Sequence, residues 1–187
     1  MNKRHSFIES EFRAKEVEDK LIVEGYFIKY NSETNLFDDV YEEVDPLSTL
    51  RSLKENDIRG LFNHDTSLVL GRTGNETLKL RSDEIGLYGE IEINREDSGA
   101  MDAYARIKRG DVVGCSFGFM PMKEDYEKRA EGGEKFIIRE MDLFEVSPCV
   151  FPAYPQTEIA ARKHNVEELR KEKLNARKQI LKGRFIK

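Results

Sequence analysis

Apolar and polar positions alternate along much of the first half of the chain, a pattern typical of strands with one buried and one solvated face. The alternation predicts strands at residues 21–29 and 36–41 and a short apolar strand at 58–63. Three more alternating segments, separated by Gly, Asn and Asp, follow and predict a β-meander. They are residues 68–72, 76–81 and 86–94.

A second strand pattern, apolar on both faces, follows in the second half of the chain. Residues 112–122 are apolar and rich in strand-forming residues, so we expect a buried strand there. The glycine-containing sequence at 130–133 predicts a hairpin tip, and residues 136–151 predict the returning strand. Pro152 and Pro155 then end the pattern.

Helix signals are few. Pro46 is well suited to a first helical turn and predicts a helix from that point. Asp97 or Ser98 can cap a second helix, which Gly110 would end. Residues 165–182 have helical composition with a weak apolar stripe, which predicts a helical tail. The fold class is therefore α+β: a mostly antiparallel, barrel-like sheet domain with a few flanking helices and a C-terminal helical tail.

Charge divides the chain unevenly. Residues 161–187 carry a net charge of +7, whereas the remaining residues carry −12. A negative body opposes a nucleic-acid-binding barrel, because a phosphate-binding face needs a positive field. We read the tail as a solvated helix or tether. No apolar run is long enough to cross a membrane, and the N-terminal sequence has no apolar signal core.

The chain has two cysteines, Cys115 and Cys149, which have neither the number nor the spacing of a zinc site. Both lie in apolar runs, so we expect buried free thiols in a reducing compartment and assign the chain to the cytoplasm.

Residues 114–118 (GCSFG) match the G-x-S-x-G pattern that marks the nucleophile elbow of α/β-hydrolases. An elbow needs a helix directly after the serine, but Ser116 is followed by two phenylalanines and Pro121, which is strand composition. The downstream histidine, His164, lies in the charged tail. The elbow interpretation therefore fails, although a strand serine can still act if a base reaches it across the sheet. Of the three histidines, His64 is the best placed to do so, since His5 lies in the N-terminal extension.

A set of short blocks in order gives a more specific indication. These are residues 62–65 (FNHD), 69–71 (VLG), 114–119 (GCSFGF), 143–147 (LFEVS) and 152–153 (PA). Together they resemble the prohead, or capsid maturation, serine proteases of tailed bacteriophages, which are relatives of the herpesvirus assemblins. The resemblance covers roughly residues 25–161. It implies a small, mostly antiparallel β-barrel of the herpesvirus-protease type, with Ser116 as nucleophile and His64 as general base.

The resemblance leaves the third catalytic residue open. The herpesvirus relatives use a second histidine, but this chain has none between His64 and His164, so a carboxylate would have to serve. We favour Glu145, because an unpaired charge in its apolar run would be costly to bury. Glu140 and Asp142, on the opposite strand face, remain alternatives. Asp65 is adjacent to His64 and is disfavoured.

Cys115 is disfavoured as the nucleophile, because strand alternation turns it away from the face of Ser116.

The resemblance implies an endopeptidase that cleaves scaffold or delta-domain segments of the major capsid protein, and also itself, inside the assembling prohead in the host bacterial cytoplasm. It implies no cofactor or metal, capsid and scaffold partners, a possible dimer, and no membrane or specific nucleic acid. We expect an N-terminal extension at 1–20, the protease domain at 21–161 and a docking or autoprocessed tail at 162–187. The alternative is a non-catalytic, scaffold-associated assembly module.

Overall fold

The computed structural model describes residues 4–9, 13–151, 167–168, 171 and 175. The chain divides into two units, Met1–Ala153 and Tyr154–Lys187. The described positions of the second unit are helical. The rest of the predicted tail helix, as well as His164, Pro152 and Pro155, lies outside the described residues.

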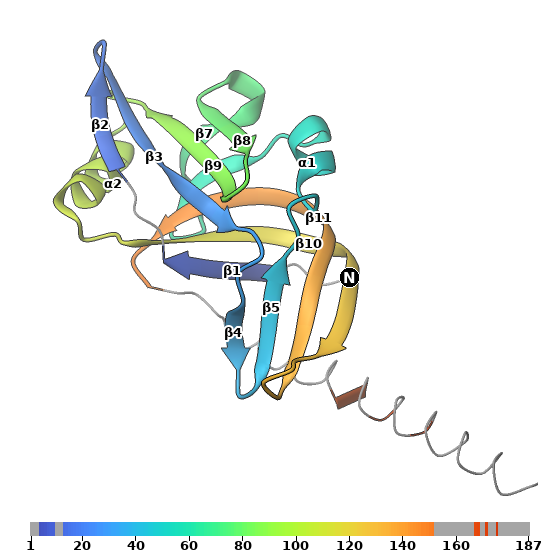
Figure 1. Ribbon diagram of the computed structural model, residues 1–187. Helices are drawn as coiled ribbons and strands as arrows, with labels where there is room; N and C mark the ends of the chain where they lie inside the picture. Colours follow the sequence, from blue (N-terminus) through green and yellow to red (C-terminus); the bar gives the residue numbers. More distant parts are fainter. Residues whose placement is uncertain (1–3, 10–12, 152–166, 169–170, 172–174, 176–187) are drawn as a thin grey trace, which may run out of the picture. The chain divides into compact units, whose positions relative to one another are not determined.

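The larger of two sheets in the first unit is built around a long antiparallel hairpin (Figure 1). Its two strands are β10 (Gly114–Lys128) and β11 (Glu134–Cys149), and the glycines of the tip, Gly132 and Gly133, have φ of 94° and 86°. This confirms the hairpin predicted at 130–133. The remaining strands of this sheet are β1 (Arg4–Glu9), β4 (Thr34–Phe37), β5 (Val40–Val44), β6 (Arg59–Phe62) and β7 (Asp65–Arg72).

The order of this sheet is β1-β10-β11-β5-β4. The outer edge of β11 is shared: β5 pairs with its first part and β6 with its second part, both in parallel orientation. The β6–β7 hairpin therefore lies beside the end of β11 that carries Glu145 and Ser147. This placement brings a hairpin tip close to the middle of the sheet.

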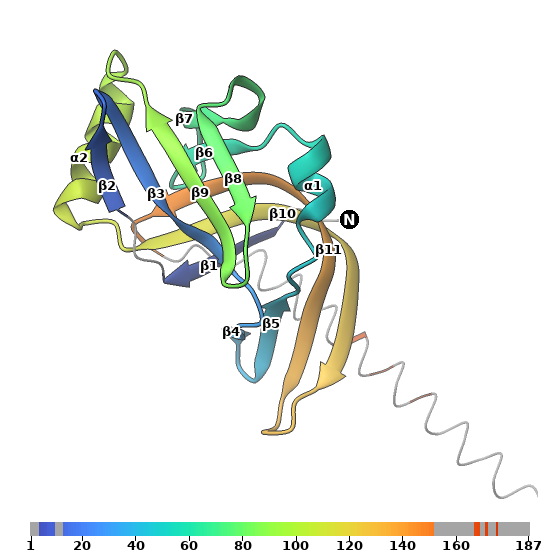
Figure 2. The same ribbon diagram turned by 45° about the horizontal axis from the view of Figure 1, so that its top comes forward.

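The smaller sheet has the order β2-β3-β9-β8 and lies over the first, as Figure 2 shows for β3 and β9 above β10. Its strands are β2 (Arg13–Val17), β3 (Lys20–Lys29), β8 (Leu78–Ser82) and β9 (Gly86–Ile93). Both sheets contribute to one apolar core, because alternate side chains of each point inward. Its fully buried large members include Phe27, Ile91, Phe117, Phe119 and Leu143.

The helix α2 (Ser98–Arg109) confirms the second helix prediction in detail. The Asp97 side chain accepts hydrogen bonds from the backbone N–H groups of Gly99 and Ala100 at its start. Gly110 ends it with φ of 87°, in the left-handed region that favours glycine. The helix buries Ala100, Ala103, Tyr104 and Ile107 against the core.

The strand pairing shows that the predicted barrel is wrong, because the described sheets do not close. Among the described residues, β1 and β4 end one sheet, β2 and β8 end the other, and no ladder joins the two. The domain is mostly β with two α-helices and two stacked sheets. Alternation along a strand identifies its buried face but contains no information about which strand edges meet, so closure was not deducible from it.

Three local predictions also need correction. Residues 36–41 are not one strand but contain the turn between β4 and β5, where Asp38 has φ of 46°. The first helix, α1 (Leu50–Glu55), begins four residues after Pro46, because the Asp45 side chain accepts a hydrogen bond from the Leu47 N–H and fixes a turn first. The meander is interrupted: β7 pairs with β6, and a 3₁₀ turn, Thr73–Asn75, leads into the other sheet.

Candidate active site

Ser116 lies in β10, and the strand continues past it to Lys128. This confirms that no helix follows the serine. On one side β11 pairs with the strand, so that Ser116 stands directly opposite Ser147, and on the other side β1 places Phe7 opposite it. Ser116 has no exposed surface. The candidate nucleophile is therefore held in the interior of a sheet rather than on a loop.

His64 lies at the tip of the β6–β7 hairpin. Phe62 and Asp65 pair across the tip, and the two residues between them have positive φ, 52° at Asn63 and 61° at His64. Positive φ at both central positions is what a two-residue type I′ turn requires, and Asn favours it. The Asn63 N–H donates to the Pro148 carbonyl at 3.0 Å. The Asn63 side-chain oxygen accepts from the Val150 N–H at 2.9 Å. The backbone and the side chain of Asn63 therefore both bind the tip to β11 and to the residue that follows it.

The two elements meet at Glu145. Its Oε1 lies 2.6 Å from Nδ1 of His64, and its Oε2 accepts a hydrogen bond of 2.6 Å from Ser147 Oγ. Ser147 Oγ in turn accepts from the backbone N–H of His64 at 3.3 Å. The His64 side chain is 15% exposed and that of Glu145 5%. A buried carboxylate needs such partners, since an isolated charge there would be strongly unfavourable.

Strand geometry places Ser116 on the same face as this pair. Directly opposed residues of neighbouring strands share a face, and residues two apart in one strand do also. Ser116 opposes Ser147, and Glu145 is two residues before Ser147, so all three side chains lie on one face. His64 reaches that face from the hairpin tip. The arrangement is a serine on β10, a carboxylate on β11 and a histidine at the β6–β7 tip. The serine–histidine hydrogen bond is not formed, because the Ser116 hydroxyl makes no hydrogen bond to any group in the described ranges.

Gly118 is the second glycine of the G-x-S-x-G pattern, and the structure shows why a glycine is needed there. It opposes Glu145 across the ladder, and a Cβ at this position would lie 2.5 Å from Oε1 of Glu145 and 2.6 Å from the Phe144 ring. The glycine thus leaves room for the carboxylate beside His64. Neither Gly118 nor Ser147 was assigned a role from the sequence. For Ser147 the available signal was its position on the face of Glu145.

The other carboxylates considered lie elsewhere. Glu140 accepts a hydrogen bond from Nε of Arg51 at 2.9 Å, and Asp142 accepts one from Nδ2 of Asn56 at 2.8 Å, so both are engaged at α1. The side chain of Asp65 turns back to Ser67, whose hydroxyl and N–H both donate to it. These hydrogen bonds lower the pKa of Asp65 below its ordinary value. Of the four carboxylates, Glu145 is the one in contact with His64.

The two cysteines are buried and unpaired with one another. Cys115 points away from Ser116 and donates to the backbone oxygens of Tyr26 and Phe27 in the other sheet, at 3.1 and 3.4 Å. Burial, with a further contribution from the charge of Glu145, raises the pKa of the Cys149 thiol to about 12. A thiol with that pKa is protonated at neutral pH and is a poor nucleophile.

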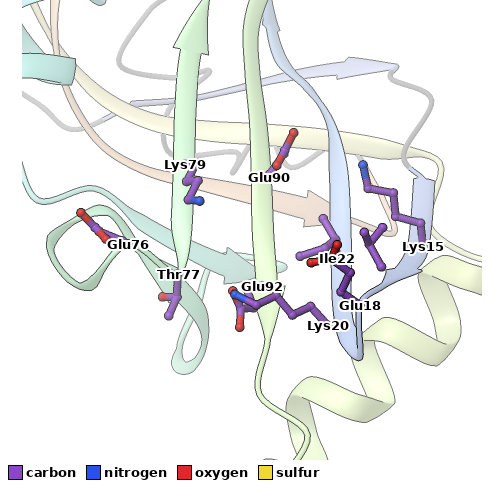
Figure 3. Close-up of a pocket in the computed structure, with 10 residues that line it drawn as sticks. Lys15, Glu18, Lys20, Ile22, Glu76, Thr77, Lys79, Glu90 and Glu92 are labelled. Carbon is purple, nitrogen blue, oxygen red and sulfur yellow. The ribbon is translucent and has the colours of Figure 1, made fainter.

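Other features of the described chain offer no competing chemistry. A hollow of about 200 Å³ opens on the smaller sheet (Figure 3), and Lys20 in its lining pairs with Glu92 at 2.8 Å. Within the described ranges no group of three or more His, Cys, Asp or Glu side chains is arranged to hold a metal ion. No helix in that part of the chain is long and apolar enough to cross a membrane.

Comparison with known proteins identifies the family of the chain. A profile of the Caudovirus prohead serine protease family matches residues 9–172. The prohead protease of Enterobacteria phage HK97 is 38% identical over 103 residues, which is 54% of this chain and 43% of that relative, so the match spans less than half of the relative's length. The solved bacteriophage T4 capsid assembly protease, gp21, aligns over 79% of this chain and 99% of its own, with 14% identity and a TM-score of 0.45. On the family match over most of its length, the chain belongs to the Caudovirus prohead serine proteases.

Proposed function

We propose that the chain is a serine endopeptidase of phage capsid maturation, with Ser116 as nucleophile, His64 as general base and Glu145 as the residue that orients the base. The observation that carries the proposal is the 2.6 Å contact between Nδ1 of His64 and Glu145, on the sheet face that also carries Ser116. Family membership supplies the reaction class. The contact and the shared sheet face support the choice of these three residues.

The roles follow from the hydrogen bonds. An ionised carboxylate can only accept, so Nδ1 of His64 carries the proton toward Glu145. The other ring nitrogen, Nε2, is then the basic one and takes the hydroxyl proton as Ser116 Oγ attacks a peptide carbonyl. The imidazolium gives that proton to the leaving amine, and an acyl-enzyme forms. Water, deprotonated by the same nitrogen, releases the acyl group and restores the serine.

The substrates we propose are scaffold or delta-domain segments of the major capsid protein, together with the protease itself. The site of action would be the interior of the assembling prohead in the host cytoplasm. In this proposal residues 21–161 form the protease domain, and the +7 tail at 162–187 docks on scaffold or is removed by autoprocessing. Dimerisation of the protease belongs to the same proposal.

Co-expression with the cognate major capsid protein tests the function. Intact mass of the capsid chain is compared for wild type, Ser116→Ala and His64→Ala. The matched control is Ser48→Ala, a fully buried serine whose hydroxyl has no hydrogen-bond partner within the described ranges. We expect a shortened capsid chain with wild type and Ser48→Ala and a full-length chain with the other two.

Full-length capsid protein in all four cultures, with folded protease and normal shells, would instead favour a non-catalytic assembly module.

A further inference from the structure

The strand β1 occupies the outer edge of β10 beside the candidate nucleophile (Figure 1). It runs antiparallel to β10 from Arg4, opposite Phe119, to Glu9, opposite Gly114. The other edge of β10 is fully paired with β11 over the same residues. An extended peptide that pairs with the backbone next to Ser116 therefore has one edge to use, and that edge is the one β1 holds.

The attachment of β1 is separable from the rest of the fold. It pairs with β10 alone, so that its loss breaks no other ladder of the sheet. Residues 4–8 lie before the region that matches the family, which begins at residue 9. Its first described residue, Arg4, forms an ion pair with Glu124, which lies in a part of β10 beyond the site. The strand can therefore leave the edge of the sheet without disrupting another strand pairing.

Ser116, the proposed nucleophile, is inaccessible to solvent in this structure. A serine that attacks a peptide must be reached by it, yet Ser116 has no exposed surface. Its hydroxyl makes no hydrogen bond to another described residue, although His64 and Glu145 are already joined. The carboxylate–histidine half of the site is therefore assembled, whereas the serine is shielded and has not engaged it.

We propose that the outer edge of β10, residues 114–119, is the docking surface for an extended segment of the protein substrate, and that β1 occupies this edge in the substrate's place. The inference rests on the proposed function, since it concerns access to the same serine. The partner is a flexible, extended polypeptide segment, recognised through backbone hydrogen bonds of the antiparallel kind that β1 makes. Phe7, opposite Ser116, marks the position of the substrate residue nearest the nucleophile.

The proposal predicts that β1 competes with substrate. The rate at which a reagent or substrate reaches Ser116 scales with the fraction of molecules in which the edge is open. If β1 is seated in about nine molecules of ten, releasing it raises that rate by about tenfold. A peptide with the sequence of residues 4–9 (RHSFIE), added separately, restores the block.

The test measures the rate at which a fluorophosphonate probe labels the full-length protein, read by intact mass. In the reaction Ser116 Oγ bonds to phosphorus and fluoride leaves, the hydroxyl proton passing to the general base. Ser6→Pro combined with Phe7→Pro removes a backbone donor to β10, because alternate N–H groups point to the partner strand. Glu124→Gln weakens the tie to Arg4 without altering β1. We expect the rate to rise about tenfold in the first variant and about 1.5- to fourfold in the second.

The matched control combines Lys15→Pro with Glu16→Pro in β2, which ends the other sheet and also pairs with one neighbour only. It disrupts an edge strand to a similar extent far from Ser116, so the labelling rate should stay unchanged. Circular dichroism confirms that each protein is folded, and Glu124→Gln decides the matter if the proline variant is not. Labelling at an equal or lower rate in the β1 variants, or no effect of the added peptide, overturns the docking proposal while the serine protease stands. Absence of label on Ser116 in every folded protein overturns both.

Discussion

At the scale of single residues, the account depends on Glu145, a charged side chain in an apolar strand with only 4% of its surface exposed. Each of its oxygens has a partner, His64 on one and Ser147 on the other. The sequence allowed the inference that a buried glutamate must have a partner, and His64 was proposed for it. It did not allow the bridging role of Ser147, whose hydroxyl also accepts from the His64 N–H.

Ser147→Ala tests that bridge. Removing the hydroxyl takes away a buried hydrogen bond to Oε2 of Glu145, so we expect the free energy of unfolding to fall by about 1–3 kcal/mol. We also expect kcat to fall about tenfold or more, because the carboxylate no longer holds His64 in one orientation. Urea unfolding and capsid cleavage measure the two effects. Ser48→Ala, which removes a buried hydroxyl without a partner in the described part, should change neither; equal losses in both variants would show that Ser147 has no special role.

Gly118→Ala tests the space reserved for the carboxylate. The added methyl group would lie 2.5 Å from Oε1 of Glu145, so the carboxylate must move away from its contact with His64. Displacements of about 1 Å at a catalytic group cost on the order of 100-fold in rate, and we expect a kcat loss of that size. Gly99→Ala is the control, since its new methyl meets the flexible end of Leu68 at 2.9 Å and a helix tolerates alanine there. A fully active Gly118→Ala enzyme would contradict the placement of Glu145.

Cys149 gives a prediction for pH. Its pKa is raised from 9.0 to about 12 in the folded protein, so above pH 9 the unfolded chain loses a proton that the folded chain retains. The unfolded state is thereby favoured, and stability falls by about 1.4 kcal/mol per pH unit from pH 9 toward the folded pKa. Urea unfolding at pH 8, 9 and 10 should show this fall in wild type and a shallower one in Cys149→Ala. Parallel pH profiles would mean that the thiol ionises as readily in the folded protein.

At the scale of elements, the β6–β7 hairpin positions the histidine, and its tip is the unusual feature. Asn63 has φ of 52°, where alanine is strained and glycine is not. We therefore expect Asn63→Ala to lower the free energy of unfolding by about 1–2 kcal/mol, and Asn63→Gly by less, the reverse of the usual order of these residues. Chemical denaturation of both variants measures it. The ordinary order, with alanine the milder change, would show that the tip does not need positive φ.

How well each element could be predicted depends on whether its cause is local. The ends of α2 follow from Asp97 and Gly110, which act within one turn, and both were predicted correctly. The start of α1 was placed too early because a side chain before Pro46, that of Asp45, forms a competing turn. The predicted meander is correct for β8 and β9, which pair antiparallel, but β7 pairs with β6 instead of β8. Alternation does not encode which of two neighbouring strands a strand pairs with.

At the scale of the whole molecule, the site is made by the long β10–β11 hairpin together with the β6–β7 tip that lies against it. The spacing of residues in the sequence does not indicate that these two hairpins contact each other. The ordered blocks shared with the prohead proteases indicated Ser116 and His64, and strand alternation separated Glu145 from Glu140 and Asp142, which contact α1 instead. The edge strand β1 was not predicted, since its backbone pairs with β10 by hydrogen bonds that leave little trace in composition.

The most direct test of the central claim is to locate the adduct that a fluorophosphonate probe forms on the purified full-length protein. Peptide mass analysis is carried out on wild type, Ser116→Ala, His64→Ala and Glu145→Gln. The account predicts a single adduct on Ser116 in wild type, none in Ser116→Ala or His64→Ala, and much slower labelling in Glu145→Gln. An adduct on another residue, or labelling of Ser116 at the same rate without His64, would contradict it.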